Sequence, residues 1–228
     1  MWVPDWVQIG EPIPQALEYH YITATRTTKG CIRKCPFCAV PQIEGKFREL
    51  KKWRKGMVLI DNNLLAASKR HFIKVMDHLK KYKWCDFSQG LDSRLLTKWH
   101  AEKIAGLSRP TVRLAWDYTS YESSFFQACE LLEKAGIPKR KINCYVLIGF
   151  NDTPEDALYR LQTIDNQGYV VFPMRYQPLN AKTKNEYVHK NWTDYELKRY
   201  MKYWSSKRYF AGIPFEDFDY NLHRRLTR

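Results

Sequence analysis

The sequence predicts an α/β fold in which about six strands alternate with helices around a parallel sheet. Short apolar segments recur along the chain, and helical periodicity follows most of them. Polar residues come directly after each of these segments. Strands separated by helices in this way are expected to pair in parallel, because a parallel crossover needs about a dozen residues or more.

The expected strands, in chain order, are residues 21–25, 57–60, 84–88, 111–116, 142–148 and 170–172. Each is rich in aliphatic, aromatic or β-branched residues and ends near polar or turn-forming residues. The second is a short apolar run stopped by Asp61-Asn62-Asn63, which is typical of a fully buried strand. Since ligands of parallel α/β sheets gather at the carboxyl ends of the strands, the polar residues after the strands are expected to face one site.

The expected helices, in chain order, are residues 65–81, 97–107, 121–135 and 154–166, followed by one that starts after residue 193. The first carries an apolar stripe at helical spacing, and Thr97 can cap the second. Gly136 is a typical stop for the third, whereas Thr153-Pro154 provides an N-cap and a first residue for the fourth. The fifth starts with the capping box Thr193-Asp194-Tyr195-Glu196.

The 228 residues are enough for one well-buried domain, and we expect a single one. Its core is expected at residues 21–180, after an irregular, proline-rich arm at residues 1–20 and before a basic C-terminal helical extension at residues 181–228. The aromatic stripe of that extension is expected to pack against the core. No apolar run reaches the roughly 18 residues that span a bilayer, and the start does not resemble a secretion signal. A cytoplasmic protein without a membrane partner is therefore expected.

The formal charge is +14, from 38 Lys and Arg against 24 Asp and Glu. Such a surface attracts polyanions, which favours tRNA, DNA or a nucleotide as substrate or partner. Residues 46–55 and the tail at residues 222–228 are the segments that could follow a phosphate backbone. Basic side chains that are only solvated would give the same composition, so both interpretations stay open.

Three of the six cysteines, Cys31, Cys35 and Cys38, lie within eight residues. Structural zinc and iron-sulfur clusters normally take four protein ligands. The nearest candidates for a fourth ligand are His20, His71 and Cys85, and none has the short spacing that makes paired ligands converge. Three thiolates would therefore leave one iron of a [4Fe-4S] cluster open to a ligand from solution. The separate thiols, which we expect in the core of a reduced protein, are Cys85, Cys129 and Cys144.

The motif Gly30-Cys31-x3-Cys35-x2-Cys38, after the first strand of a six-unit β/α pattern, resembles the radical S-adenosylmethionine superfamily over roughly residues 20–180. The stretch GCIRKCPFCAVPQIEGKFR is similar to the cluster loops of its cobalamin-associated and methylthiotransferase branches, and VLIGFNDTPEDA is similar to their fifth-strand segment. The resemblance implies a partial, open TIM barrel of about six β/α units. This sequence has no second cysteine cluster and we expect no cobalamin-binding domain, which distinguishes it from those branches.

By this resemblance the three clustered cysteines ligate a [4Fe-4S] cluster, and S-adenosylmethionine chelates the open iron. The residues expected to contact S-adenosylmethionine are Phe37, Asp61, Asn62, Asp117 and Gly149. Phe37 would lie beside the adenine, and Asp61 with Asn62 would hold the amino group where the family often has Gly-Gly-Glu. Asp117 would meet the ribose or serve as a helix N-cap. Gly149 would back the adenine or serve as a turn glycine.

The resemblance implies an enzyme that cleaves S-adenosylmethionine reductively to a 5′-deoxyadenosyl radical, with an external electron donor such as flavodoxin or ferredoxin. The radical would abstract hydrogen from a substrate, and a nucleic acid base or a nucleotide fits the charge. No residue is singled out as catalytic on the substrate, and both oxidoreductase and transferase outcomes stay open. The alternative hypothesis is a non-catalytic, zinc-stabilised nucleic-acid-binding protein that uses the three thiolates and a distant histidine.

Overall fold

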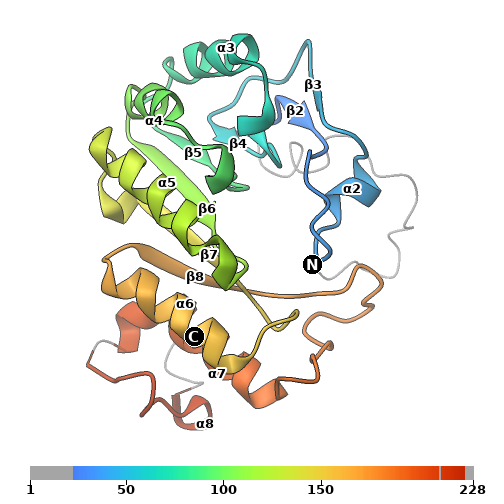
Figure 1. Cartoon of the computed structure of the whole chain (residues 1–228), viewed down its shortest axis with the longest axis vertical. Helices are drawn as coiled ribbons and strands as arrows, with labels where there is room; N and C mark the ends of the chain where they lie inside the picture. The colour runs from blue at the N-terminus through green and yellow to red at the C-terminus, as the bar shows by residue number, and fades with distance from the viewer. Residues whose placement is uncertain (1–22, 211, 224–228) are drawn as a thin grey trace. The chain divides into compact units, whose positions relative to one another are not determined.

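A computed structural model describes residues 23–210 and 212–223 (Figure 1). These residues form two compact units. The N-terminal unit contains residues 23–115 and 123–143, and the C-terminal unit contains residues 116–122 and the described residues from 144 onward. The predicted arm at residues 1–20, including His20, lies outside the described residues, and so does the tail from residue 224 onward.

The principal sheet has six strands in the order β1-β4-β5-β6-β7-β8. Their bounds are β1 Ala24–Thr25, β4 Val58–Leu59, β5 Cys85–Phe87, β6 Pro110–Ala115, β7 Ile142–Ile148 and β8 Val170–Arg175. β4 pairs in parallel with both β1 and β5, and β5 pairs in parallel with β6. The predicted α/β class with a six-stranded parallel sheet is confirmed, and each strand overlaps a segment that its apolar residues predicted.

A short antiparallel ribbon, β2 Thr28–Lys29 with β3 Arg48–Glu49, was not predicted. Its two strands flank the segment that carries the clustered cysteines and the short helix α2 Val40–Ile43. Each strand has two residues, which is too short for alternation to be recognised in the sequence. The ribbon closes the base of the cysteine segment.

Besides α2, the helices of the N-terminal unit are α3 Lys69–Leu79, α4 Lys98–Ala105 and α5 Glu122–Lys134, of which all but the first residue belongs to this unit. Figure 1 shows α3 and α4 beside β4 and β5. α3 begins later than predicted, because the Ser68 side chain accepts a hydrogen bond from the backbone N–H of His71 at 3.2 Å and caps the helix there. Thr97 caps α4, as predicted. Phe72 of α3 is fully buried and meets the Trp99 ring of α4 at a centroid distance of 5.4 Å.

The helices of the C-terminal unit are α6 Pro154–Asn166, α7 Asp194–Ser205 and α8 Tyr220–His223. Thr153 caps α6, and Thr193 with Glu196 forms the predicted capping box of α7. α7 packs on β8, and its buried aromatic residues lie against further rings, as in the contact between Tyr200 and Phe215 with a centroid distance of 4.7 Å. The short 3-10 helices of the chain are η1 Leu64–Ala66, η2 Ser93–Leu95, η3 Thr119–Tyr121, η4 Lys139–Lys141 and η5 Lys207–Phe210.

None of the described helices has both the length and the apolar character that crossing a membrane requires.

Burial alternates along β5, β6, β7 and β8, whereas both residues of β1 and both of β4 are buried. In β6 of the N-terminal unit, Val112 and Leu114 are fully buried, whereas Thr111 and Arg113 are partly exposed. In the C-terminal unit the exposed apolar side chains of β8 are Val170 at 41 %, Phe172 at 38 % and Met174 at 43 %. A parallel sheet with helices on both faces buries both sets of side chains. In β6, β7 and β8, one face of the strand is packed and the other is at least partly accessible.

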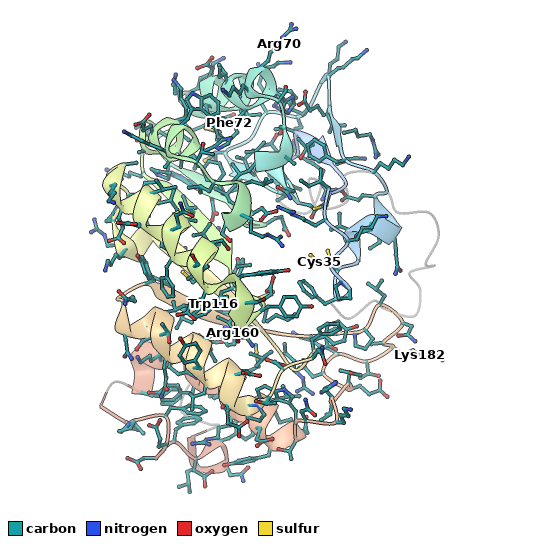
Figure 2. All side chains as sticks on the ribbon, in the orientation of Figure 1. Cys35, Arg70, Phe72, Trp116, Arg160 and Lys182 are labelled. Atoms are coloured by element: carbon teal, nitrogen blue, oxygen red, sulfur yellow. The ribbon has the colours of Figure 1, made fainter. Side chains whose placement is uncertain are left out.

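Arg160 of α6 organises the C-terminal unit although it is only 1 % exposed. Its guanidinium donates to the carbonyl oxygens of Trp116 at 2.9 Å and Leu147 at 3.0 Å, and to Asp152 Oδ2 at 2.7 Å. Figure 2 shows Arg160 and Trp116 next to each other. Burial lowers the pKa of Arg160, and the charge of Asp152 opposes that change. Arg160, together with its ion-pair partner Asp152, thus connects the end of β7 and the residue after β6 to the segment that leads into α6.

Replacing Arg160 with Leu is expected to lower the free energy of unfolding by about 3–5 kcal/mol, because the Asp152 carboxylate loses its buried cation. Urea denaturation monitored by circular dichroism measures the change. Arg140→Leu, at an exposed position of η4, is the matched control and should change the free energy by less than about 0.5 kcal/mol. Equal effects of the two substitutions would contradict this role of Arg160.

Candidate functional site

The clustered cysteines, Cys31, Cys35 and Cys38, are half-buried on the segment between β2 and α2. Figure 2 labels Cys35 on this segment. The Cys38 N–H donates to the Cys35 carbonyl oxygen at 3.0 Å, which closes a turn over Pro36-Phe37. Proline at the second position favours such a turn. The turn therefore brings the backbones of two of the cysteines together locally, with Phe37 half-buried in it.

The sulfur of Cys31 accepts two hydrogen bonds. The backbone N–H of Arg33 donates to Cys31 Sγ at 3.3 Å, and Asn63 Nδ2 donates to it at 3.4 Å. Donors of this kind stabilise negative charge on sulfur, which suits a thiolate that ligates a metal. Asn63 follows β4, so this contact places Cys31 at the carboxyl end of that strand.

Asp92, which follows β5, anchors the middle of the cysteine loop. Its Oδ2 accepts from Arg33 Nε at 2.8 Å and from Asn63 Nδ2 at 3.3 Å, while its Oδ1 accepts from Arg94 Nε at 2.7 Å. Burial raises the pKa of Asp92, but the hydrogen bonds and charges of Arg94 and Arg33 outweigh it and lower the pKa below its usual value. Asp92 therefore stays ionised and holds the loop to the end of the strand.

Glu44, just after α2, anchors the start of the loop. Its Oε2 accepts from the Gly30 N–H and from Asn62 Nδ2, both at 2.8 Å, and its Oε1 pairs with Arg26. Gly30 has a φ of 72°, and a Cβ there would lie 2.6 Å from the Gly45 carbonyl oxygen. Only glycine fits this close approach. Glu44 thus connects the residue before Cys31 to one that follows β4.

Asp61 is buried at 3 % exposure, and the contacts that the structure gives it are internal. Its Oδ1 accepts from the backbone N–H and the hydroxyl of Thr27, at 2.8 and 3.0 Å, and from the same two groups of Thr28. Burial raises the pKa of Asp61 to about 6, although these four hydrogen bonds lower it. Asp61 therefore fixes the chain between β1 and β2, which leads into the cysteine loop.

The raised pKa makes Asp61 a source of pH-dependent stability. Because the folded pKa lies above the unfolded value, its contribution is fully present below about pH 4 and is lost as the pH rises through about 6. The loss is expected to be about 3 kcal/mol, at about 1.4 kcal/mol per pKa unit. Asp61→Asn keeps an acceptor oxygen without the charge, so urea denaturation from pH 4 to 7 should show a flatter stability profile than in the wild type.

The exposed Asp77→Asn is the control for that comparison, and its profile should run parallel to the wild type. A constant loss of stability in Asp61→Asn at every pH would show that the buried carboxyl does not titrate in this range.

The predicted residues Asp117 and Gly149 lie in the C-terminal unit. Asp117 is half-buried after β6, its carbonyl oxygen accepts from Arg160 at 3.2 Å, and Tyr118 rather than Asp117 holds the N-cap position of η3. Gly149 has a φ of 77°, and a Cβ there would lie 2.8 Å from Leu197 Cδ2 of α7. Its missing side chain therefore serves a turn and helix packing. That these two residues share a site with Cys31 stays a prediction.

The structure thus brings Cys31 together with Asn63 and Asp92, and Asn62 together with Glu44. Sequence reasoning expected residues 61–63 and 89–92, which follow strands, to face the common site, but it gave a specific ligand contact only to Asp61 and Asn62. It gave no role to Glu44. The signal available for Asn63 was its place in the polar run Asp61-Asn62-Asn63 directly after β4. No comparable signal marked Glu44.

Within residues 23–210 and 212–223, no three His, Cys, Asp or Glu side chains converge as a metal site. The donor set still suits a cluster chemically, because it supplies three half-buried thiols and two N–H donors to Cys31 Sγ. The candidate fourth ligands Cys85 and His71 are less suited to binding a metal. Burial raises the pKa of Cys85 to about 12, so this thiol stays protonated, and His71 is 6 % exposed with its ring against Trp53.

Comparisons with known proteins do not assign the chain to a family. No family model matches the sequence, and no curated protein matches it significantly. The functional conclusion therefore depends on the chemistry of the cysteine loop and its contacts.

Proposed function

We propose that the chain is a radical S-adenosylmethionine enzyme in which Cys31, Cys35 and Cys38 hold a [4Fe-4S] cluster. The observation that carries the proposal is the cysteine loop itself. It presents three half-buried thiols in a C-x3-C-x2-C spacing, and Cys31 lies against Asn63 at the end of a parallel strand. Ligand sites of parallel α/β proteins occupy that end of the sheet.

When bound, the cluster and S-adenosylmethionine supply a carbon radical that takes hydrogen from the substrate, after one electron from a donor such as flavodoxin or ferredoxin breaks the sulfonium C–S bond. The residues of this chain bind and orient. Glu44 holds the start of the loop in place through Gly30, and Asp92 holds its middle through Arg33. Arg33 and Asn63 donate to Cys31 Sγ, and hydrogen bonds to the sulfurs are one determinant of a cluster's reduction potential.

Among the predicted contacts to the methionine amino group, Asn62 is better placed than Asp61. Asn62 is half-buried, and its amide nitrogen donates to Glu44, which leaves the amide oxygen as an acceptor beside a carboxylate. Asp61 is only 3 % exposed, and its Oδ1 already accepts four internal hydrogen bonds. Phe37 in the turn before Cys38 is assigned to the adenine, and the contacts of Asp117 and Gly149 to S-adenosylmethionine stay predictions from the sequence.

We further propose that the sheet is a partial, open TIM barrel. One-sided burial along β6, β7 and β8 supports this architecture, since one face of these strands is left at least partly accessible. In a barrel that is only partly closed, the accessible face lines the interior, where a substrate can reach the ends of the strands.

Replacing Cys35 with Ala is expected to abolish cluster binding and the cleavage of S-adenosylmethionine, because two thiolates are too few to hold the cluster. The measurement is the iron and sulfide content and the visible absorbance of protein purified and reconstituted without oxygen, followed by detection of 5′-deoxyadenosine after reduction. The wild type should bind about four iron atoms per chain.

Cys85→Ala is the matched control, because this thiol is buried and protonated. The Cys85→Ala variant should still bind iron and still cleave S-adenosylmethionine. A wild-type protein that binds zinc and neither iron nor sulfide would refute the proposal and favour the zinc-stabilised alternative. Retained cleavage in Cys35→Ala would refute the ligand assignment.

A further inference from the structure

A groove in the N-terminal unit lies between the loop at residues 51–55 and α3. It has a volume of about 730 Å³. The basic side chains that line it are Lys51, Lys52, Lys55, Arg70, Lys74 and Lys81. Figure 2 shows Arg70 extending from α3 away from the rest of the N-terminal unit. The groove is separate from the residues that contact the cysteine loop.

Specific contacts preform the groove. Lys74 Nζ lies 4.4 Å from the centroid of the Trp53 ring and donates to the Lys51 carbonyl oxygen at 3.2 Å. Farther along α3, His78 Nε2 lies 2.8 Å from the Gly56 carbonyl oxygen. These contacts attach both ends of the loop to the helix, so a ligand would meet a formed surface.

The charge of the groove is almost entirely positive. The one carboxylate that lines it, Asp77, pairs with Lys80 at 2.8 Å. Lys74 is engaged by the Trp53 ring and the Lys51 carbonyl oxygen. The other five basic side chains that line the groove are exposed and make no ion pair within the described part of the chain. Their charges are therefore available to an anionic ligand with several negative groups.

The apolar part of the groove indicates which polyanion it binds. Trp53 and His78 are half-buried, and Ile73 is 42 % exposed between the basic side chains. Sites for single-stranded nucleic acid combine a positively charged groove, which follows the phosphates, with aromatic side chains that contact the bases. We propose that this groove binds the backbone of single-stranded nucleic acid, with the phosphates on the lysine and arginine side chains.

Binding at the groove does not require the cluster. One part of this inference rests on the proposed function, namely that the bound nucleic acid is also the substrate of the radical reaction. Binding is therefore measured on the full chain before cluster reconstitution, so that a failure of binding and a failure of cluster chemistry are separate results.

The test compares two variants with the same change in net charge. The groove variant is Lys52→Gln, Lys55→Gln, Arg70→Gln and Lys81→Gln. The control variant is Lys103→Gln, Lys182→Gln, Lys184→Gln and Lys190→Gln, all at exposed positions outside the groove. Circular dichroism of both variants verifies folding, and fluorescence anisotropy with labelled 20-nucleotide single-stranded RNA and DNA measures binding between about 50 and 200 mM salt.

The groove variant should bind at least about tenfold more weakly than the wild type, and the slope of log affinity against log salt should fall by about 3, since each single-strand phosphate contact contributes about 0.7. The control variant should keep nearly the wild-type affinity and slope. Preference for RNA or for DNA identifies the polymer, and either supports the proposal.

Three results would overturn it: equal losses in the two variants, no binding at low salt, or binding of inorganic polyphosphate or of vesicles containing phosphatidylserine as tightly as the oligonucleotides. The first would assign binding to overall charge. The last would identify a general anion or lipid surface in place of a nucleic acid site.

Discussion

The attachment of the cysteine loop to the ends of β4 and β5 is the constraint on which the proposed chemistry depends. A loop with three thiols has little regular structure of its own, and thiolates close to one another repel. Glu44 and Asp92 supply two carboxylates that accept from the loop backbone and from Arg33, and Asn63 contacts the sulfur of Cys31 directly. Charge-assisted hydrogen bonds of this kind are stronger than neutral ones, so they can hold a loop whose residues are only half-buried.

Each unit has a buried polar group that supports its loops. Asp61 fixes the chain before the cysteine loop through Thr27 and Thr28, and Arg160 binds the carbonyl oxygens after β6 and in β7. Burying a charge is costly unless hydrogen bonds and counter-charges compensate. Asp61 follows β4, and the Arg160 guanidinium reaches from α6 to backbone carbonyls near the carboxyl ends of β6 and β7. Polar burial is thus concentrated where the candidate site requires defined loops.

The basic charge of the chain has a spatial organisation that composition does not reveal. Carboxylates near the cysteine loop are engaged with arginines of that region, as in the pairs of Arg26 with Glu44 and of Arg33 with Asp92. In the groove beside α3, by contrast, basic side chains outnumber the single carboxylate, which is itself paired with Lys80. Within the described residues, unpaired basic side chains therefore line the groove, while the carboxylates of Glu44 and Asp92 beside the loop are each paired with an arginine. The loop suits a cofactor, and the groove suits a polymer of phosphates.

Signals confined to a few neighbouring residues were enough to predict the α/β class, the helices capped by Thr97, Thr153 and Thr193, and the cysteine motif, because capping and burial periodicity act over one turn or one strand. The two-residue strands of the ribbon and the late start of α3 were missed, since a single cap or bridge leaves a weak pattern. The anchors of the cysteine loop could be recognised only after the chain had folded. The bonds to Cys31 and Arg33 join residues 32 and 59 positions apart, and such contacts exist only once parallel strands bring distant loops to the same edge of the sheet.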